Sequence, residues 1–119
     1  MVDETYKIAV ASSDGLVVNS HFGRANTFYI YQVGEDGESV LIEERNLIPV
    51  CEGGNHDDAR LNENLDRLSD CDFILVSKIG DGAANAASQK GIESYEIPGV
   101  IEESIEQLLK YVKLKKLFE

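Results

Sequence analysis

The chain has 119 residues, a length typical of one domain, and 43% of them are hydrophobic, which is enough for one core. Its net charge is −11, so it lacks the basic surface that nucleic-acid binding requires. No run of about 18 apolar residues is present for a membrane span, and two cysteines are too few for a disulfide framework. The acidic N-terminus is unlike a signal peptide, so we expect one cytoplasmic domain over residues 1–119.

The first half of the chain predicts three strands. Residues 6–13 are rich in Ile, Val and Ala and predict the first strand. Residues 27–33 are aromatic and β-branched and predict the second. The glycines and acidic residues at 34–37 then form a hairpin turn, so we expect residues 39–48 to run antiparallel to the second strand.

The second half alternates helices with strands. Leucines spaced by four and three residues predict a helix over residues 57–69, and the apolar run at 72–77 predicts a strand that is buried on both faces. An alanine-rich helix follows at about 82–90, then a strand at 92–96. A last helix spans about 100–116, with its apolar residues on one stripe.

This order, β-β-β-α-β-α-β-α, predicts an α/β fold with a mixed sheet and flanking helices. We expect residues 6–12 and 72–77 in the centre of the sheet. The hairpin of residues 27–33 and 39–48 is expected on its antiparallel side. The segment from Pro49 to Asp57 is predicted to be a loop.

The first candidate binding segment contains His21, Phe22, Gly23 and Arg24, in the connection between the first two predicted strands. A neutral imidazole is a common metal ligand, and a glycine lets the backbone approach a bulky ligand. The arginine could neutralise an anionic ligand. The alternative is a loop histidine that is bonded to local backbone.

The second candidate is the glycine-rich loop that carries Cys51, Gly53, Gly54 and His56. Thiolates select iron–sulfur clusters, zinc or Cu(I). A structural zinc site needs about four protein ligands, and this set is incomplete. Such a set suits a ligand that arrives with its own inorganic framework. The alternative is a flexible loop with an incidental thiol.

A third segment, Ile79-Gly80-Asp81-Gly82-Ala83, lies between a predicted strand and a predicted helix and could form one edge of an anion pocket. The dinucleotide fingerprint needs a third glycine, but Asn85 stands in its place. Cys71 is expected to be a buried small hydrophobe. The aspartates suggest a further alternative, a metal-dependent hydrolase built on Asp14, Asp70 and Asp72.

Several segments of this sequence resemble the pattern of one family, and they occur in the same order from about residue 6 to 112. They are residues 7–15, the His-Phe-Gly-x-Ala segment at 21–25 with Phe28, the Cys-x-Gly-Gly loop at 51–54, residues 79–83, and Gly91-Ile92. The family is the dinitrogenase iron–molybdenum cofactor biosynthesis family, which includes the NifX, NafY and VnfX carriers and the C-terminal domain of NifB.

The resemblance implies a ribonuclease H-like fold without nuclease activity, and binding of an iron–sulfur or iron–molybdenum-type cluster as transient cargo. It implies a non-enzymatic carrier or scaffold in metallocluster assembly, with a radical-SAM or nitrogenase-assembly protein as partner. NifB's radical-SAM chemistry needs three cysteines, and this chain has two. The alternative is a metal-free module that docks on an assembly enzyme. The residues expected to bind the cluster are His21, Phe22, Gly23, Arg24, Cys51, Gly53, Gly54, His56, Gly80 and Gly82, with His21, Cys51 and His56 as metal ligands.

Overall fold

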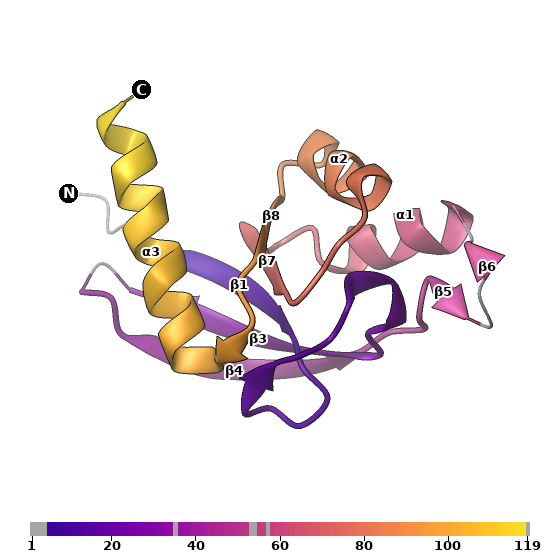
Figure 1. The fold of residues 1–119 in the computed structure, drawn as a ribbon, viewed down its shortest axis with the longest axis horizontal. Coiled ribbons are helices and arrows are strands. Elements are labelled where there is room, and N and C mark those ends of the chain that lie inside the picture. The colour runs from indigo at the N-terminus through magenta and orange to yellow at the C-terminus, as the bar shows by residue number, and fades with distance from the viewer. Residues whose placement is uncertain (1–4, 35, 53–54, 57, 119) are drawn as a thin grey trace.

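A computed structural model describes residues 5–34, 36–52, 55–56 and 58–118 (Figure 1). The main sheet contains β1 (Tyr6–Ala11), β3 (Thr27–Val33), β4 (Ser39–Asn46), β7 (Phe73–Val76) and β8 (Glu93–Glu96). The helices are α1 (Asp58–Arg67), α2 (Asp81–Gln89) and α3 (Ile101–Leu117), and η1 (Phe22–Arg24) is a 3-10 turn. Two short ladders pair β2 (Val17–Val18) with β9 (Gly99–Val100), and β5 (Cys51–Glu52) with β6 (Asn55–His56).

The five strands lie in the order β4-β3-β1-β7-β8, with β1 in the middle. The pairs β1–β3 and β3–β4 are antiparallel, whereas β1–β7 and β7–β8 are parallel. The predicted mixed α/β sheet and the predicted side of its hairpin are therefore confirmed. Within the described residues, no helix is long and apolar enough to cross a membrane.

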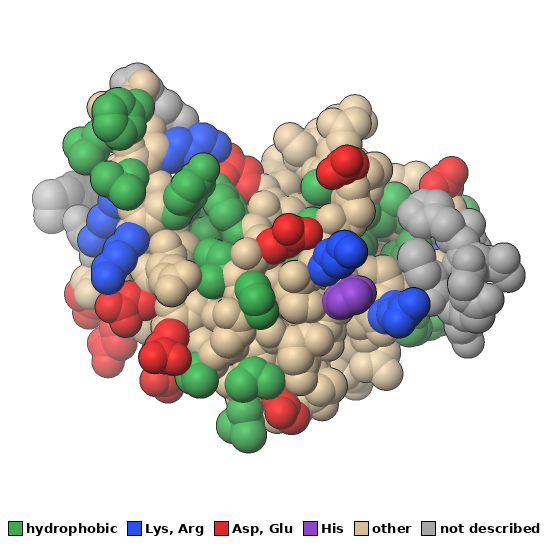
Figure 2. All heavy atoms as spheres, viewed as in Figure 1, with side chains coloured by type: hydrophobic (Ala, Val, Ile, Leu, Met, Phe, Trp, Pro, Cys, Tyr) green, Lys and Arg blue, Asp and Glu red, His purple; other side chains and the backbone are tan. Residues whose placement is uncertain are grey.

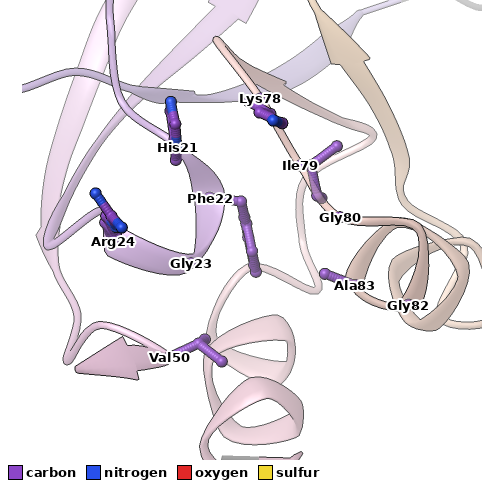
Figure 3. Close-up of a pocket in the computed structure, with 10 residues that line it drawn as sticks. All are labelled: His21, Phe22, Gly23, Arg24, Val50, Lys78, Ile79, Gly80, Gly82 and Ala83. Carbon is purple, nitrogen blue, oxygen red and sulfur yellow. The ribbon is translucent and has the colours of Figure 1, made fainter. Parts of the chain in front are cut away.

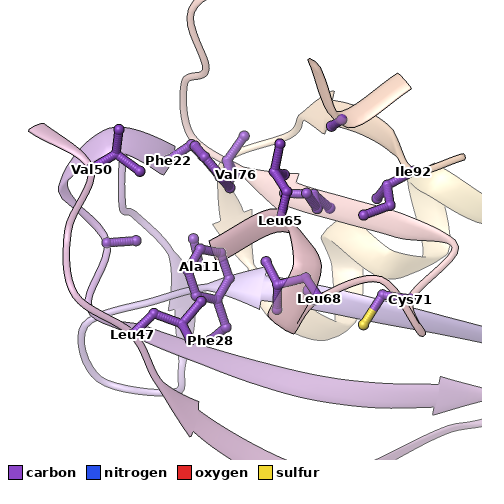
Figure 4. Packing of buried hydrophobic residues seen from close by; sticks show 14 of the residues in the cluster. Ala11, Phe22, Phe28, Leu47, Val50, Leu65, Leu68, Cys71, Val76 and Ile92 are labelled. Atoms are coloured by element: carbon purple, nitrogen blue, oxygen red, sulfur yellow. The ribbon is translucent and has the colours of Figure 1, made fainter. Parts of the chain in front are cut away.

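The core has two layers because successive residues of a strand point to opposite faces of the sheet. Ala9 and Ala11 of β1 face α1 and α2, in a cluster that includes Leu65 and Phe28 (Figure 4). Ile8 and Val10 face the other way and pack with the buried stripe of α3. Since α1 and α2 cover one face and α3 the other, the two faces carry separate surfaces.

The first predicted strand ends two residues early because a polar turn begins at Ser12. The Ser12 hydroxyl accepts a hydrogen bond from the Gly15 N–H at 2.9 Å. The Asp14 carboxylate accepts the N–H groups of Leu16 and Val17 at 2.9 and 3.2 Å. Gly15 has a positive φ of 76°, which favours glycine at this position.

The segment from Pro49 to Asp57, predicted to be a loop, differs from that prediction because it contains the β5–β6 ladder. Cys51 and His56 are register partners there. Each strand has two residues, which is too short for any periodicity to appear in the sequence. Gly53, Gly54 and Asp57 lie outside the described residues.

Arg45 joins the edge strand β4 to the end of α1. Its guanidinium donates to both carboxylate oxygens of Asp70 at 2.7 and 2.8 Å and also pairs with Glu43. Lys7 on β1 bonds the same aspartate at 3.2 Å. These hydrogen bonds, chiefly those from Arg45, hold the pKa of Asp70 well below its usual range.

We expect Asp70→Asn to destabilise the fold at neutral pH and to flatten its pH dependence. The depressed pKa means that ionised Asp70 stabilises the fold above about pH 4, the unfolded-state value, and that this contribution is lost as pH falls further. The side chain is 42% exposed, so we discount the loss to about 1 kcal/mol. Urea unfolding at neutral and acidic pH measures it.

Asp66→Asn is the matched control for this prediction, because its carboxylate pairs with Lys90 but is 68% exposed. We expect that control to lose little stability at either pH. If the difference in the free energy of unfolding between wild type and Asp70→Asn stayed constant as the pH was lowered, that result would contradict the assigned role of the Asp70 carboxylate.

Candidate functional site

A cavity of about 550 Å³ opens at the carboxyl end of β7, where ligands commonly bind in open α/β sheets (Figure 3). One wall is the turn η1 with the residue before it, and the other is the connection from β7 into α2. We call it the His21 pocket, and the described residues that line it are His21, Phe22, Gly23, Arg24, Val50, Lys78, Ile79, Gly80, Gly82 and Ala83.

Backbone hydrogen bonds hold the η1 wall against the end of β7. The Phe22 N–H donates to the Lys78 carbonyl at 2.9 Å, and the Ser77 N–H donates to the Ser20 carbonyl at 3.1 Å. The Phe22 side chain is buried in the core, with its ring 5.9 Å from that of Phe28. Because Phe22 is anchored, His21 before it and Arg24 two residues after it stay exposed at defined positions.

The opposite wall is built around two glycines. The Ile79 N–H donates to the Glu96 carboxylate at 2.8 Å, which ties the segment before α2 to the end of β8. A Cβ placed on Gly80 or Gly82 would meet no heavy atom within 4 Å, and neither glycine has a positive φ. Packing and backbone geometry therefore do not require glycine here, and the missing side chains leave space in the pocket.

The pocket is basic on an acidic protein. Arg24 and Lys78 contribute positive charge beside His21, and the described lining residues include no aspartate or glutamate. Two acids lie at the edge of the pocket: Glu96, which accepts the Ile79 N–H, and Asp81 in the first turn of α2. Figure 2 shows a histidine flanked by two basic side chains on this face. The first N–H groups of α2 add partial positive charge at the Gly80 edge. With a net charge of −11 over the whole chain, this arrangement favours an anionic ligand locally.

The structure brings six of the predicted binding residues together in the pocket: His21, Phe22, Gly23, Arg24, Gly80 and Gly82. Cys51 and His56 lie on the neighbouring β5–β6 ladder, and β5 is close to η1. The predicted role of Gly53 and Gly54 falls on residues outside the described part of the chain.

Two lining residues, Lys78 and Val50, lay outside the candidate segments, and Lys78 is chemically the more important. Ile79 and Ala83 also line the pocket and belong to the third candidate segment, although they were not among the residues expected to bind the cluster. Lys78 follows the buried strand β7 and precedes Gly80. A polar residue at the carboxyl end of a central strand, just before a glycine-led helix, is the signal that could have identified it.

Cys71 and the three aspartates lie apart from this chemistry. Cys71 is buried as predicted, and burial raises the pKa of its thiol to about 12, so it is unreactive. Asp14 caps its own turn and Asp70 pairs with Arg45. Across the part of the chain that the structure describes, no three His, Cys, Asp or Glu residues gather closely enough to hold a metal ion.

Fold and pocket together define a small α/β domain with a basic pocket at the carboxyl end of its central strands. The chain belongs to the dinitrogenase iron–molybdenum cofactor family, whose model matches residues 4–111. This finding confirms the resemblance noted in the sequence.

Two curated relatives are the FeMo cofactor biosynthesis proteins NifB of Frankia alni and Chlorobaculum tepidum. They are 36% and 33% identical to this chain, over 88% and 94% of its length. The matched segments are 21% and 26% of the relatives' own length, so this chain spans about a quarter of those proteins or less.

Two solved structures share the fold. One is a crystal structure of PH0822, with a TM-score of 0.63 and 19% identity, covering 87% of this chain and 90% of that one. The other is an NMR structure of a putative NifB protein from Thermotoga, with a TM-score of 0.57 and 20% identity, covering 88% of both chains.

Proposed function

We propose that this chain is a non-catalytic carrier or scaffold that binds an iron–sulfur or iron–molybdenum-type cluster in the His21 pocket during metallocluster assembly. The observation that carries this proposal is the meeting of an exposed imidazole, two cationic side chains and a glycine-led helix start in one cavity. In this proposal His21 is a metal ligand, and Cys51 and His56 of the adjacent ladder supply further ligands.

The chemistry of the lining supports a preassembled, anionic cargo. Such a cluster carries its own sulfides, so a few protein ligands suffice, and imidazole and thiolate both suit iron. Arg24, Lys78 and the α2 amides would offset its negative charge. A carrier must also release its cargo, which disfavours a full set of four thiolates.

Membership of the cofactor biosynthesis family supports the assembly context. The partner in this proposal is a radical-SAM or nitrogenase-assembly protein that delivers or accepts the cluster. The relatives are FeMo cofactor biosynthesis proteins, but this chain matches only a small part of them, so their whole activity is not assigned to it.

Anaerobic reconstitution with ferrous iron and sulfide tests the proposal, read by visible absorption and by iron bound per chain. We expect wild type to take up a cluster, and the Arg24→Gln, Lys78→Gln double variant to bind several-fold more weakly at low salt. The two proteins should converge at high salt because screening removes the charge attraction.

Lys90→Gln is the matched control, because it removes one positive charge from the far end of α2, where Lys90 pairs with Asp66. Its loading should equal that of wild type. If the wild-type chain took up no iron at any salt concentration, that result would contradict the carrier proposal and favour a metal-free docking module.

A further inference from the structure

Charge is segregated along α3. From residue 101 to 106 the helix carries Glu102, Glu103 and Glu106 and no basic residue, and from 107 to 118 it carries lysines and no acidic residue. Lys115 and Lys116 bond Glu93 and Tyr6 of the same chain. Lys110 and Lys113 lie on the exposed side of the helix, where Lys110 pairs with Glu106 of the same chain at 3.7 Å.

The C-terminal end of α3 also exposes large apolar side chains. Tyr111, Leu114, Leu117 and Phe118, which we call the α3 tail, are 55%, 56%, 77% and 87% exposed. In Figure 2 hydrophobic side chains gather at this end of the helix, with basic and then acidic ones towards its start. The helix dipole accounts for acids before bases along a helix, and Tyr111 packs against Tyr95 with ring centroids 5.4 Å apart. Neither observation accounts for the exposure of Leu114, Leu117 and Phe118.

A groove beside residues 102–113 of α3 carries more acidic than basic side chains. It lies between this helix and the turn that joins β3 to β4, and has a volume of about 570 Å³. Leu109, which is partly buried, supplies apolar surface among its described lining residues, whereas Ile105 is buried in the core. Four carboxylates line the same groove against two lysines, Lys110 and Lys113: they belong to Asp36, Glu38, Glu102 and Glu106.

We propose that two copies of this chain form a two-fold dimer through antiparallel α3 helices, with the tail of each helix lying in the groove of the other. In that arrangement Glu106 of one copy lies near Lys113 of the second copy. Leu114 and Leu117 cover the partly exposed side chain of Leu109.

A second copy is the occupant because the groove begins at the acidic start of α3, whereas the exposed leucines of the tail lie at the C-terminal end of the same helix. A two-fold axis near the middle of α3 makes both contacts twice and closes the assembly. The acidic half of each helix then faces the basic half of the other, so the charges attract along the whole contact. Since α3 and the α1–α2 layer cover opposite faces of the sheet, both His21 pockets stay open.

Charge reversal tests this pairing, with the dimer dissociation constant measured by sedimentation equilibrium over a range of protein concentrations. We expect Glu106→Lys and Lys113→Glu each to raise that constant by about tenfold or more, because each places like charges across the interface twice. The double variant carries the swapped pair and should return to within a few-fold of wild type.

Two controls separate the interface from general effects. Lys90→Glu, at the residue after α2, makes the same change in net charge as Lys113→Glu and should leave the dimer intact. Leu117→Ser should weaken the dimer without altering the helical circular dichroism signal. A wild-type chain that stays monomeric at the highest soluble concentration would overturn the dimer. If the double variant had a dissociation constant as high as those of the single variants, the antiparallel pairing would be wrong. It would also be wrong if the chain stayed monomeric and its α3 tail bound anionic phospholipid vesicles instead.

Discussion

Replacing His21 and Cys51 together by alanine should reduce loading of a purified precursor cluster by at least about tenfold, since removing even groups that only support a metal ligand costs 10–100-fold in affinity. His21 is the stronger contributor in this prediction, because it lines the pocket directly beside Lys78. Cys51 lies on the strand next to η1. The measurement is iron bound per chain after anaerobic loading and desalting.

Two single variants, His21→Ala and Cys71→Ala, show whether a loss of loading comes from the site or from the fold. His21 is exposed, so His21→Ala should leave the unfolding midpoint nearly unchanged while loading falls. Cys71→Ala removes the buried cysteine and should leave loading intact, because its thiol lies in the core away from the pocket. Full loading of the His21→Ala, Cys51→Ala double variant would refute the assignment of these ligands.

The main elements of the fold could be predicted because each is long enough to show its period. The aromatic and β-branched run at 27–33 matches β3, Thr27–Val33, and the leucines that predicted the helix at 57–69 lie on or next to α1, Asp58–Arg67. The short ladders could not be predicted. β2 and β9 pair residues far apart in the chain, and two-residue strands carry no periodic signal.

The location of the site followed from topology, whereas its charge did not. Connections that leave the carboxyl ends of parallel strands meet at one edge of the sheet, which is why the segments with His21 and Gly80 line one cavity. Lys78 was missed because it looks like an ordinary surface lysine in the sequence. It lies beside His21 because the Phe22 N–H bonds its carbonyl group.

Gly82→Leu should weaken cluster loading while leaving the fold as stable as wild type or slightly more stable. Gly82 lies in the first turn of α2 and lines the pocket. A Cβ there meets nothing within 4 Å, so the added side chain has room to project into the space that the cluster would occupy. Glycine is a poor helix former, so the substitution should stabilise α2 by about 0.5 kcal/mol. Urea unfolding and iron per chain measure the two effects.

These opposite effects separate pocket blocking from misfolding. Gly82→Ala, with a smaller side chain, should show the same gain in stability and a smaller loss of loading. Ser88→Leu adds the same leucine to an exposed position of α2 that does not line the pocket, so it should load as wild type does. If Gly82→Leu loaded fully while His21→Ala did not, the imidazole would bind the cluster from outside the cavity. Space for the cluster would then not explain why glycine occupies positions 80 and 82.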